Sequence, residues 1–177
     1  LNLVEGDGTN FTRLIDSYKG KKLNSPNDVS IAKDGSTYFT DPMFGIQGYG
    51  PEKAESELGY AGIYKLVNGQ LSLLNKDLAT PNGIAITNDQ RTLIVSDTST
   101  DQLFSIDLTS FSGKPVAATL LTTLNKLNDG GDGHGPDGLK IAADGSIWAT
   151  GKGGIHVLEA DGTFKCGIPF PNHVANL

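Results

Sequence analysis

Three short segments of this 177-residue sequence place a polar side chain directly after a proline. They read SPN (25–27), TPN (80–82) and GPD (135–137). Asn82 follows Asn27 by 55 residues (82 − 27), and Asp137 follows Asn82 by another 55 (137 − 82). Amide and carboxylate oxygens are hard donors that suit Ca²⁺ or Mg²⁺ better than metals preferring sulfur. Brought together, the three would form a divalent metal site; taken singly, each would only cap a turn before a strand.

The sequence after these residues repeats as well. Each site residue is followed by an apolar alternation, a polar turn and a second apolar run. A fixed period of this length indicates repeated supersecondary units. We predict four strands in each period: 28–33, 36–40, 61–67 and 70–75; 83–87, 92–97, 102–107 and 116–122; and 138–142, 146–150, 153–158 and 163–168.

Four short antiparallel strands per unit are typical of a β-propeller blade. A β-sandwich is the rival, but it would not repeat its sequence at a fixed period. We therefore predict an all-β chain holding about three complete blades plus a hairpin that pairs 1–4 with 11–15. Propellers close with roughly four to eight blades, so the chain is expected to be part of a larger one. The predicted division is the end of one blade (1–24), three blades (25–79, 80–134, 135–170) and the start of another (171–177).

The repeat also predicts where the site residues lie. The innermost strand of each blade lines the central channel, so Asn27, Asn82 and Asp137 should surround one point at its mouth. The proline before each residue fixes the backbone that leads into the strand. The second strand of each blade runs back to the same face, so Asp41 and Asp97, which end those strands, are predicted to contact substrate.

A polar excursion, 41–60, leaves the first blade on this face. It is either a lid over the channel mouth or a loop that packs on its own blade. As a lid it would supply apolar walls from Met43, Phe44, Tyr49 and Tyr60.

Three other features are less informative about chemistry. The Gly/Asp-rich run 128–134 fails the EF-hand template, because the position that needs Glu is Leu139, and we interpret it as a loop leading to Asp137. His134 in this loop is either a proton shuttle near the substrate or an exposed histidine, and His156 is predicted to be structural. Cys166 is the only cysteine, so an internal disulfide is excluded, and we expect it to be buried in a strand.

The composition limits the kinds of partner that the chain is expected to bind. The net charge is −6 and no cluster of Lys or Arg occurs, which argues against nucleic acid and against anionic membrane surfaces. No apolar run approaches the ~20 residues of a membrane-spanning helix. The sequence begins at Leu1 without a methionine, so a processed or truncated start stays open. Cytoplasmic, periplasmic and secreted locations, and the oligomeric state, stay open too.

The motifs PND (26–28), TDP (40–42), PNG (81–83) and PDG (136–138), in this order, resemble the gluconolactonase, regucalcin and luciferin-regenerating enzyme family, also called the senescence marker protein family. The resemblance covers essentially the whole chain and is closest to bacterial and fungal gluconolactonase-like members. It implies a six-bladed propeller with one divalent metal at the channel mouth.

The resemblance also implies roles for particular residues. In the family the metal is held by a Glu of a Glu-Gly-Pro motif, by the Asn matching Asn82 and by the Asp matching Asp137. The residue matching Asn27 contacts the metal or the substrate, and Asp137 matches the usual general base. The Glu-Gly-Pro motif is absent, and the segment 5–7 (Glu-Gly-Asp) is no substitute.

The expected function is therefore hydrolysis of a sugar lactone such as gluconolactone. The metal, Ca²⁺ first with Mg²⁺, Mn²⁺ or Zn²⁺ as alternatives, would polarise the lactone carbonyl, and Asp137 would act on the attacking water. Substrate contacts are expected from Asn27, Asp41, Asp97 and His134. The alternatives are a related esterase or phosphotriesterase, and a non-catalytic ligand-binding or strictosidine synthase-like propeller.

Overall fold

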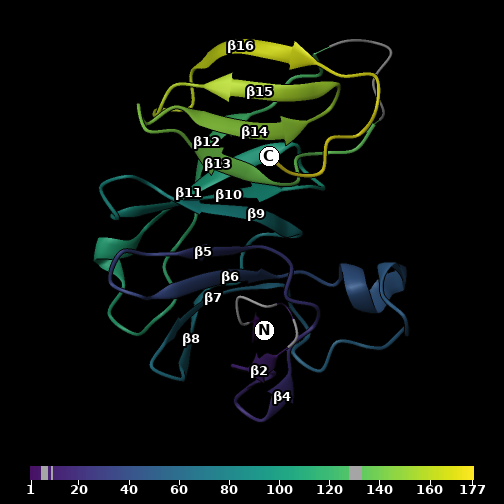
Figure 1. Ribbon diagram of the computed structural model, residues 1–177, viewed down its shortest axis with the longest axis vertical. Helices are drawn as coiled ribbons and strands as arrows, with labels where there is room; N and C mark the ends of the chain where they lie inside the picture. Colours follow the sequence, from purple (N-terminus) through teal and green to yellow (C-terminus); the bar gives the residue numbers. More distant parts are fainter. Residues whose placement is uncertain (5–7, 9, 128–132) are drawn as a thin grey trace.

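The computed structural model describes residues 1–4, 8, 10–127 and 133–177, and its regular secondary structure consists almost entirely of β-strands (Figure 1). Three four-stranded antiparallel sheets form its body. The first contains β5 (Val29–Ile31), β6 (Thr37–Asp41), β7 (Gly62–Val67) and β8 (Gln70–Asn75). The second contains β9 (Pro81–Ile86), β10 (Thr92–Asp97), β11 (Gln102–Asp107) and β12 (Thr119–Thr123). The third contains β13 (Leu139–Ile141), β14 (Ile147–Gly151), β15 (Gly154–Leu158) and β16 (Phe164–Pro169).

Within each sheet, strands that are consecutive in the chain are hydrogen-bonded neighbours. The tight turns between them use glycines with positive φ, such as Gly69 and Gly145, a backbone conformation that costs glycine nothing. Every predicted strand of the three units is present, with ends shifted by at most a few residues. The all-β prediction is confirmed.

The sheets stack face to face (Figure 1), and apolar side chains fill the space between them. The core between the first and second sheets includes Tyr38, Ile63 and Val95. The core between the second and third sheets includes Ile94, Leu139 and Ile147. This burial supplies the main driving force for stacking, but it is non-directional and does not by itself fix the sheets laterally.

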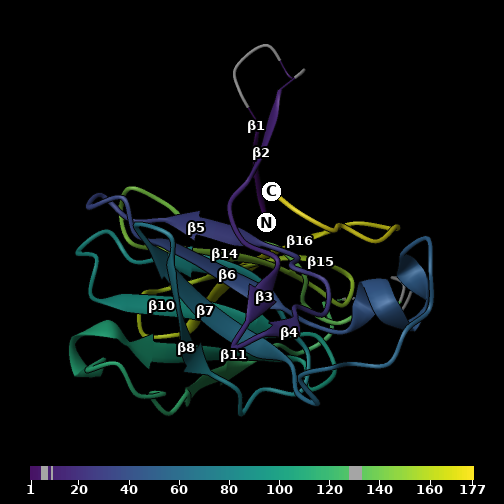
Figure 2. The same ribbon diagram turned by 90° about the horizontal axis from the view of Figure 1, so that it is seen from below.

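The N-terminal part forms two small hairpins. β1 (Asn2–Val4) pairs with β2 (Phe11–Arg13) as predicted, and in Figure 2 this pair stands away from the body. β3 (Ser17–Tyr18) and β4 (Lys21–Lys22) form a second hairpin that was not predicted, because two-residue strands show no alternation. Tyr18 packs edge-on against Tyr64, with 5.3 Å between ring centroids, and ties this hairpin to the first sheet.

Two further details differ from the sequence-based expectations. The excursion 41–60 contains one helical turn, η1 (Gly45–Tyr49). Cys166 is exposed, so the prediction that it is buried is wrong. Its strand, β16, is an edge strand of the third sheet, and most of its residues are exposed. In the described part of the chain, no helix has the length and apolar character needed to span a membrane.

Asp41 and Asp97 fix the turns that lead into the innermost strands. The Asp41 carboxylate accepts hydrogen bonds from the backbone N–H groups of Asn24 (2.9 Å) and Ser25 (2.8 Å). The Asp97 carboxylate accepts the equivalent hydrogen bond from Ala79 N–H (2.8 Å). It also accepts a hydrogen bond from the Thr80 hydroxyl (2.8 Å). Each aspartate therefore holds the residues that precede the proline of its own sheet.

The two aspartates differ in their protonation. Burial raises the pKa of Asp41 to about 6, despite the two backbone donors. Burial acts in the same direction on Asp97, but hydrogen bonds from Thr80, Ser99 and Ala79 outweigh it, and the pKa of Asp97 is lowered. The additional hydroxyl donors of Thr80 and Ser99 account for the contrast.

These shifts predict opposite effects of pH on stability. Asp41 contributes stability that is fully present below its ordinary pKa of 3.8 and is lost as pH rises through about 6. Relative to Asp41→Asn, the parent should therefore lose roughly 2 kcal/mol of unfolding free energy between pH 4 and pH 7. For Asp97 the sign is reversed, and the parent should lose stability relative to Asp97→Asn as pH falls. Urea unfolding of all three proteins from about pH 2 to pH 7 measures both differences, because the Asp97 effect falls at and below the ordinary aspartate pKa of 3.8. Equal slopes in the parent and in either variant would contradict the assignment.

Candidate functional site

The three repeated polar residues lie at the same end of three neighbouring strands. Asn27 immediately precedes the strand region of β5, Asn82 lies in β9, and Asp137 comes just before β13. β5 and β13 both contact β9, one from each side (Figure 1). All three residues line one cavity of about 270 Å³. The structure thus brings Asn27, Asn82 and Asp137 together.

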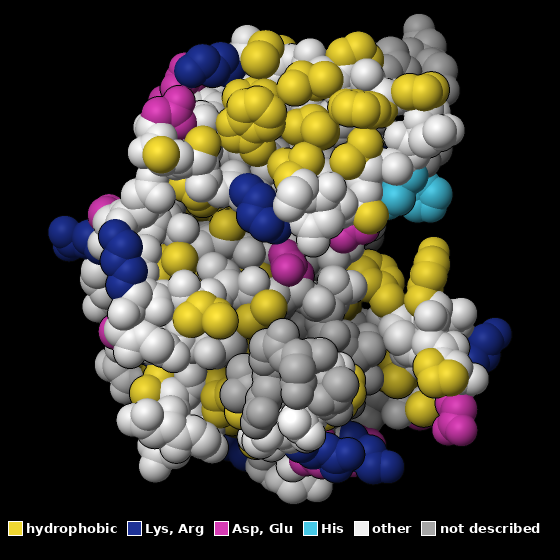
Figure 3. All heavy atoms as spheres, in the orientation of Figure 1, with side chains coloured by type: hydrophobic (Ala, Val, Ile, Leu, Met, Phe, Trp, Pro, Cys, Tyr) yellow, Lys and Arg dark blue, Asp and Glu magenta, His cyan; other side chains and the backbone are white. Residues whose placement is uncertain are grey.

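Further residues complete the cavity, which is visible as a notch in Figure 3 with the histidines on one side and hydrophobic side chains on the other. The apolar wall is formed by Phe44 and Tyr49, whose ring centroids are 6.0 Å apart. They come from the excursion 41–60, which therefore does reach the site. The remaining lining residues are Thr98, His134, Gly135 and His173.

The other two aromatic or sulfur side chains predicted for this wall lie elsewhere. Met43 lines a separate hollow inside the excursion. The Tyr60 ring lies 5.5 Å from the ammonium nitrogen of Lys76.

Asn82 is the most distinctive group in the cavity. Only 4% of its surface is exposed, and its Nδ2 donates to the Thr98 hydroxyl at 3.0 Å. The Thr98 hydroxyl in turn donates to the carbonyl of Pro136 at 2.7 Å, which fixes the orientation of the amide. Within the described residues, Asn82 Oδ1 is buried and has no hydrogen-bond partner. A buried acceptor without a partner is costly, so this atom calls for a cation or a donor from a bound molecule.

Asp137 supplies the carboxylate. Burial raises its pKa, and the nearby Asp28 carboxylate acts in the same direction. His173 opposes both, because its Nε2 lies 3.5 Å from Asp137 Oδ2. The net effect is a raised pKa, so the ionised carboxylate is a stronger base than an exposed aspartate.

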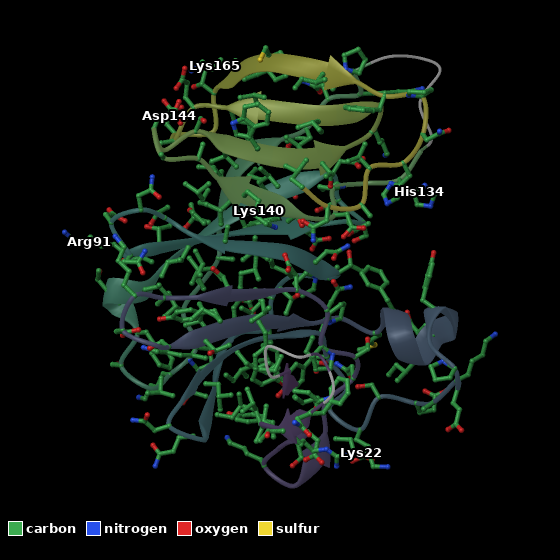
Figure 4. The ribbon with its side chains drawn as sticks, viewed as in Figure 1. Lys22, Arg91, His134, Lys140, Asp144 and Lys165 are labelled. Carbon is green, nitrogen blue, oxygen red and sulfur yellow. The ribbon has the colours of Figure 1, made fainter. Side chains whose placement is uncertain are left out.

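Two histidines stand on the same side of the cavity. The rings of His134 and His173 pack with their centroids 4.6 Å apart. Figure 4 shows His134 at the open side of the notch, between the third sheet and the excursion. His134 was predicted to lie near the site, whereas His173 was missed, because it belongs to the last seven residues, which contain no full repeat to compare.

Asp41 and Asp97 do not line the cavity. They are 0% and 1% exposed, and their carboxylates are occupied by the turns described above. Their burial is at odds with the predicted contact with substrate. They position the site through the backbone instead.

The donors present fit a hard divalent cation. Asn27, Asn82 and Asp137 offer amide and carboxylate oxygens around one cavity, and one of these oxygens is buried without a partner. Among the described residues no group of three His, Cys, Asp or Glu side chains forms a metal-binding cluster, and a set of two amides and one carboxylate would not form one. The segment 5–7, which does not replace the Glu-Gly-Pro motif, and residues 128–132 of the run that fails the EF-hand template lie outside the described residues.

Comparison with known proteins identifies the family. Residues 2–177 match the family described as the SMP-30/Gluconolactonase/LRE-like region. The chain belongs to this family. The resemblance inferred from the four motifs is confirmed.

Individual relatives agree with this assignment. A gluconolactonase from Zymomonas mobilis is 37% identical over 153 residues, which are 84% of this chain and 42% of that protein. A gluconolactonase from Xanthomonas campestris has a solved structure that is 30% identical, with a TM-score of 0.84, and the match covers 99% of this chain and 57% of that one. The fold is shared by regucalcin, a calcium-binding protein from Agrobacterium tumefaciens (20% identical, TM-score 0.63, 85% and 48% covered). The chain thus spans about half the length of the relatives it matches.

The contact between His173 and Asp137 yields a prediction for the metal-free protein. Because His173 lowers the pKa of Asp137, His173→Ala should raise this pKa further. NMR titration of the Asp137 side-chain carboxyl carbon measures the shift. Asp161→Asn, a change in an exposed turn, should leave the Asp137 titration unchanged and serves as the control. An Asp137 titration that is identical in the parent and in His173→Ala would exclude this electrostatic role.

Proposed function

We propose that the protein carrying this chain hydrolyses a sugar lactone at the cavity formed by Asn27, Asn82 and Asp137. The observation that carries the proposal is the unpaired, buried Asn82 Oδ1 in the same cavity as a carboxylate with a raised pKa. Membership of the family and sequence identities of 37% and 30% to two gluconolactonases support a sugar lactone as the substrate class.

We also propose that the three sheets are three blades, 25–79, 80–134 and 135–170, of a six-bladed propeller. The relatives are about twice as long as the matched region, which leaves room for further blades. The third sheet supports this, because hydrophobic side chains gather on its uncovered side (Figure 3). Ile168 is 37% exposed and Phe170 39%, and Trp148 lines a shallow hollow there.

The proposed ligands of one divalent cation are Asn82 Oδ1, the Asp137 carboxylate and the Asn27 side chain, with Ca²⁺ favoured and Mg²⁺, Mn²⁺ or Zn²⁺ as alternatives. Bound there, such a cation supplies Lewis-acid polarisation of a carbonyl oxygen. The chain's own groups perform the remaining tasks. Phe44 and Tyr49 provide an apolar wall for the C–H face of the lactone ring, and His134 and His173 face its polar substituents.

Asp137 accepts the proton of the attacking water, a task that a carboxylate within reach of the carbonyl carbon can perform as general base. The water oxygen bonds to the carbonyl carbon, the ring C–O bond breaks, and the alkoxide leaving group takes up a proton. The product is the open-chain hydroxy acid, so lactone and water balance the reaction.

Two substitutions in the protein that carries this chain test the proposal. Asp137→Asn keeps the size of the side chain but removes its charge and basicity, so we expect weaker Ca²⁺ binding and a loss of gluconolactone hydrolysis of about a hundredfold or more. Asn82→Ala removes the buried acceptor and should chiefly weaken Ca²⁺ binding, so that excess Ca²⁺ partly restores activity. Calorimetric titration with Ca²⁺ and a pH-stat assay of lactone opening measure both effects.

The control is again Asp161→Asn, which removes a carboxylate from an exposed turn and should change neither quantity. If Asp137→Asn opens the lactone as fast as the parent, the catalytic assignment is wrong. If the parent neither binds a divalent cation nor opens the lactone, a ligand-binding propeller replaces the lactonase.

A further inference from the structure

Three buried hydroxyl groups occur at equivalent positions in the three sheets. Thr40, Ser96 and Thr150 each lie near the end of the second strand of their sheet, and none of them is exposed to solvent. A hydroxyl carries one donor and two acceptor sites, so a single group of this kind can connect two backbone segments.

Each hydroxyl accepts a hydrogen bond from the start of the innermost strand in its own sheet. Thr40 Oγ1 accepts from Asp28 N–H at 3.2 Å, and Ser96 Oγ accepts from Gly83 N–H at 2.8 Å. Thr150 Oγ1 accepts from the N–H of Asp137 at 2.9 Å. Thr40 and Ser96 thus accept from equivalent residues, and Thr150 accepts from the residue one position earlier in its motif.

Two of the hydroxyls also donate to the next sheet, and the acceptors are backbone carbonyls of the site residues. Thr40 Oγ1 donates to the carbonyl of Asn82 at 2.7 Å. Ser96 Oγ donates to the carbonyl of Asp137 at 2.7 Å. The first sheet thus holds Asn82 of the second, and the second sheet holds Asp137 of the third.

The backbones meet closely at the second of these bridges. Gly83 N–H also points to the Asp137 carbonyl at 3.1 Å. A Cβ atom on Gly83 would lie 2.2 Å from that carbonyl oxygen and 2.9 Å from Gly138 Cα, so only glycine fits. The distance between β9 and the start of β13 is therefore fixed by direct polar contact as well as by apolar packing.

We propose that Thr40 and Ser96 are positioning residues for the ligand site: their hydroxyl bridges set the spacing of Asn27, Asn82 and Asp137. The proposal rests on the proposed function, because it assigns the bridges to the geometry of the cation and lactone site. Apolar packing between the sheets permits small lateral shifts, whereas a hydrogen bond from a buried hydroxyl to a carbonyl is directional. Loss of a bridge would move a ligand residue without removing it.

The test compares Ser96→Ala with Ser96→Thr, and Thr40→Val with Thr40→Ser, in the protein that carries this chain. The alanine and valine variants remove the hydroxyl, and the other two retain it. The matched control is Ser146→Ala. Ser146 is also a buried hydroxyl (5% exposed), but it bonds to Asp144 in the turn before β14, at the opposite end of the sheet from His134 (Figure 4).

Ca²⁺ affinity, the kinetics of gluconolactone opening and urea unfolding are measured for each variant. A purely structural role lowers the folded fraction, and it leaves the Ca²⁺ dissociation constant of the folded protein unchanged. For a positioning role we expect Ser96→Ala and Thr40→Val to weaken Ca²⁺ binding about tenfold and to lower kcat more than they raise KM. Ser96→Thr, Thr40→Ser and Ser146→Ala should stay within about twofold of the parent.

Failure of this inference can be told from failure of the proposed function. If the parent binds Ca²⁺ and opens the lactone but Ser96→Ala and Thr40→Val do so equally well, the bridges do not position the site. If the parent neither binds Ca²⁺ nor opens the lactone, the lactonase proposal fails. Amide NMR spectra then still show whether the hydroxyl bridges position Asn82 and Asp137. The side-chain amide signals of Asn82 and the backbone signal of Asp137 should then shift in both hydroxyl-free variants and not in Ser146→Ala; unshifted signals would overturn it.

Discussion

The free edge of β9 imposes the constraint on which the site depends. β9 is the edge strand of the second sheet, and its outward N–H groups are buried between the sheets, so they need acceptors from elsewhere. Ile84 N–H donates a hydrogen bond to the Asp28 carboxylate at 3.0 Å, and Ile86 N–H donates one to the Ser30 hydroxyl at 3.1 Å. Gly83 N–H donates both to the Ser96 hydroxyl of its own sheet and to the Asp137 carbonyl that leads into the third sheet. Polar side chains are therefore needed at the interface between sheets that is otherwise apolar. Their hydrogen bonds connect the three innermost strands.

The backbone N–H groups named above have hydrogen-bond partners, whereas the side-chain oxygen of Asn82 does not. The difference points to a ligand. The Nδ2 and the backbone carbonyl of Asn82 are both paired, which holds the side chain in place, whereas Oδ1 is buried without a partner among the described residues. A buried oxygen without a partner lowers the stability of the fold. A ligand-binding role explains why the chain retains it, in agreement with the tendency of functional sites to break local rules of stability.

The repeat in the sequence was sufficient to predict the strands and the convergence of Asn27, Asn82 and Asp137, because period and strand alternation determine both. The orientation of Asp41 and Asp97 could not be predicted, since it depends on which backbone N–H groups of the preceding turn lack partners. His173 has no counterpart in the other units, so the comparison of repeats that found Asp137 could not find it. The roles of Thr40 and Ser96 depend on contacts between sheets, which alternation within a strand does not encode.

The electrostatics of the cavity favour a cation over a neutral ligand alone. Asp137 is half-buried and close to the Asp28 carboxylate, and both effects disfavour its ionised form. His173 compensates only in part, as the net rise in the pKa of Asp137 shows. A divalent cation between Asn82 and Asp137 would remove both penalties at once, because it stabilises the carboxylate and gives Asn82 Oδ1 a partner. With such a cation held by Asn82 and Asp137, Lewis-acid polarisation of a carbonyl would act in the same cavity as a carboxylate base, the combination that the proposed lactone hydrolysis uses.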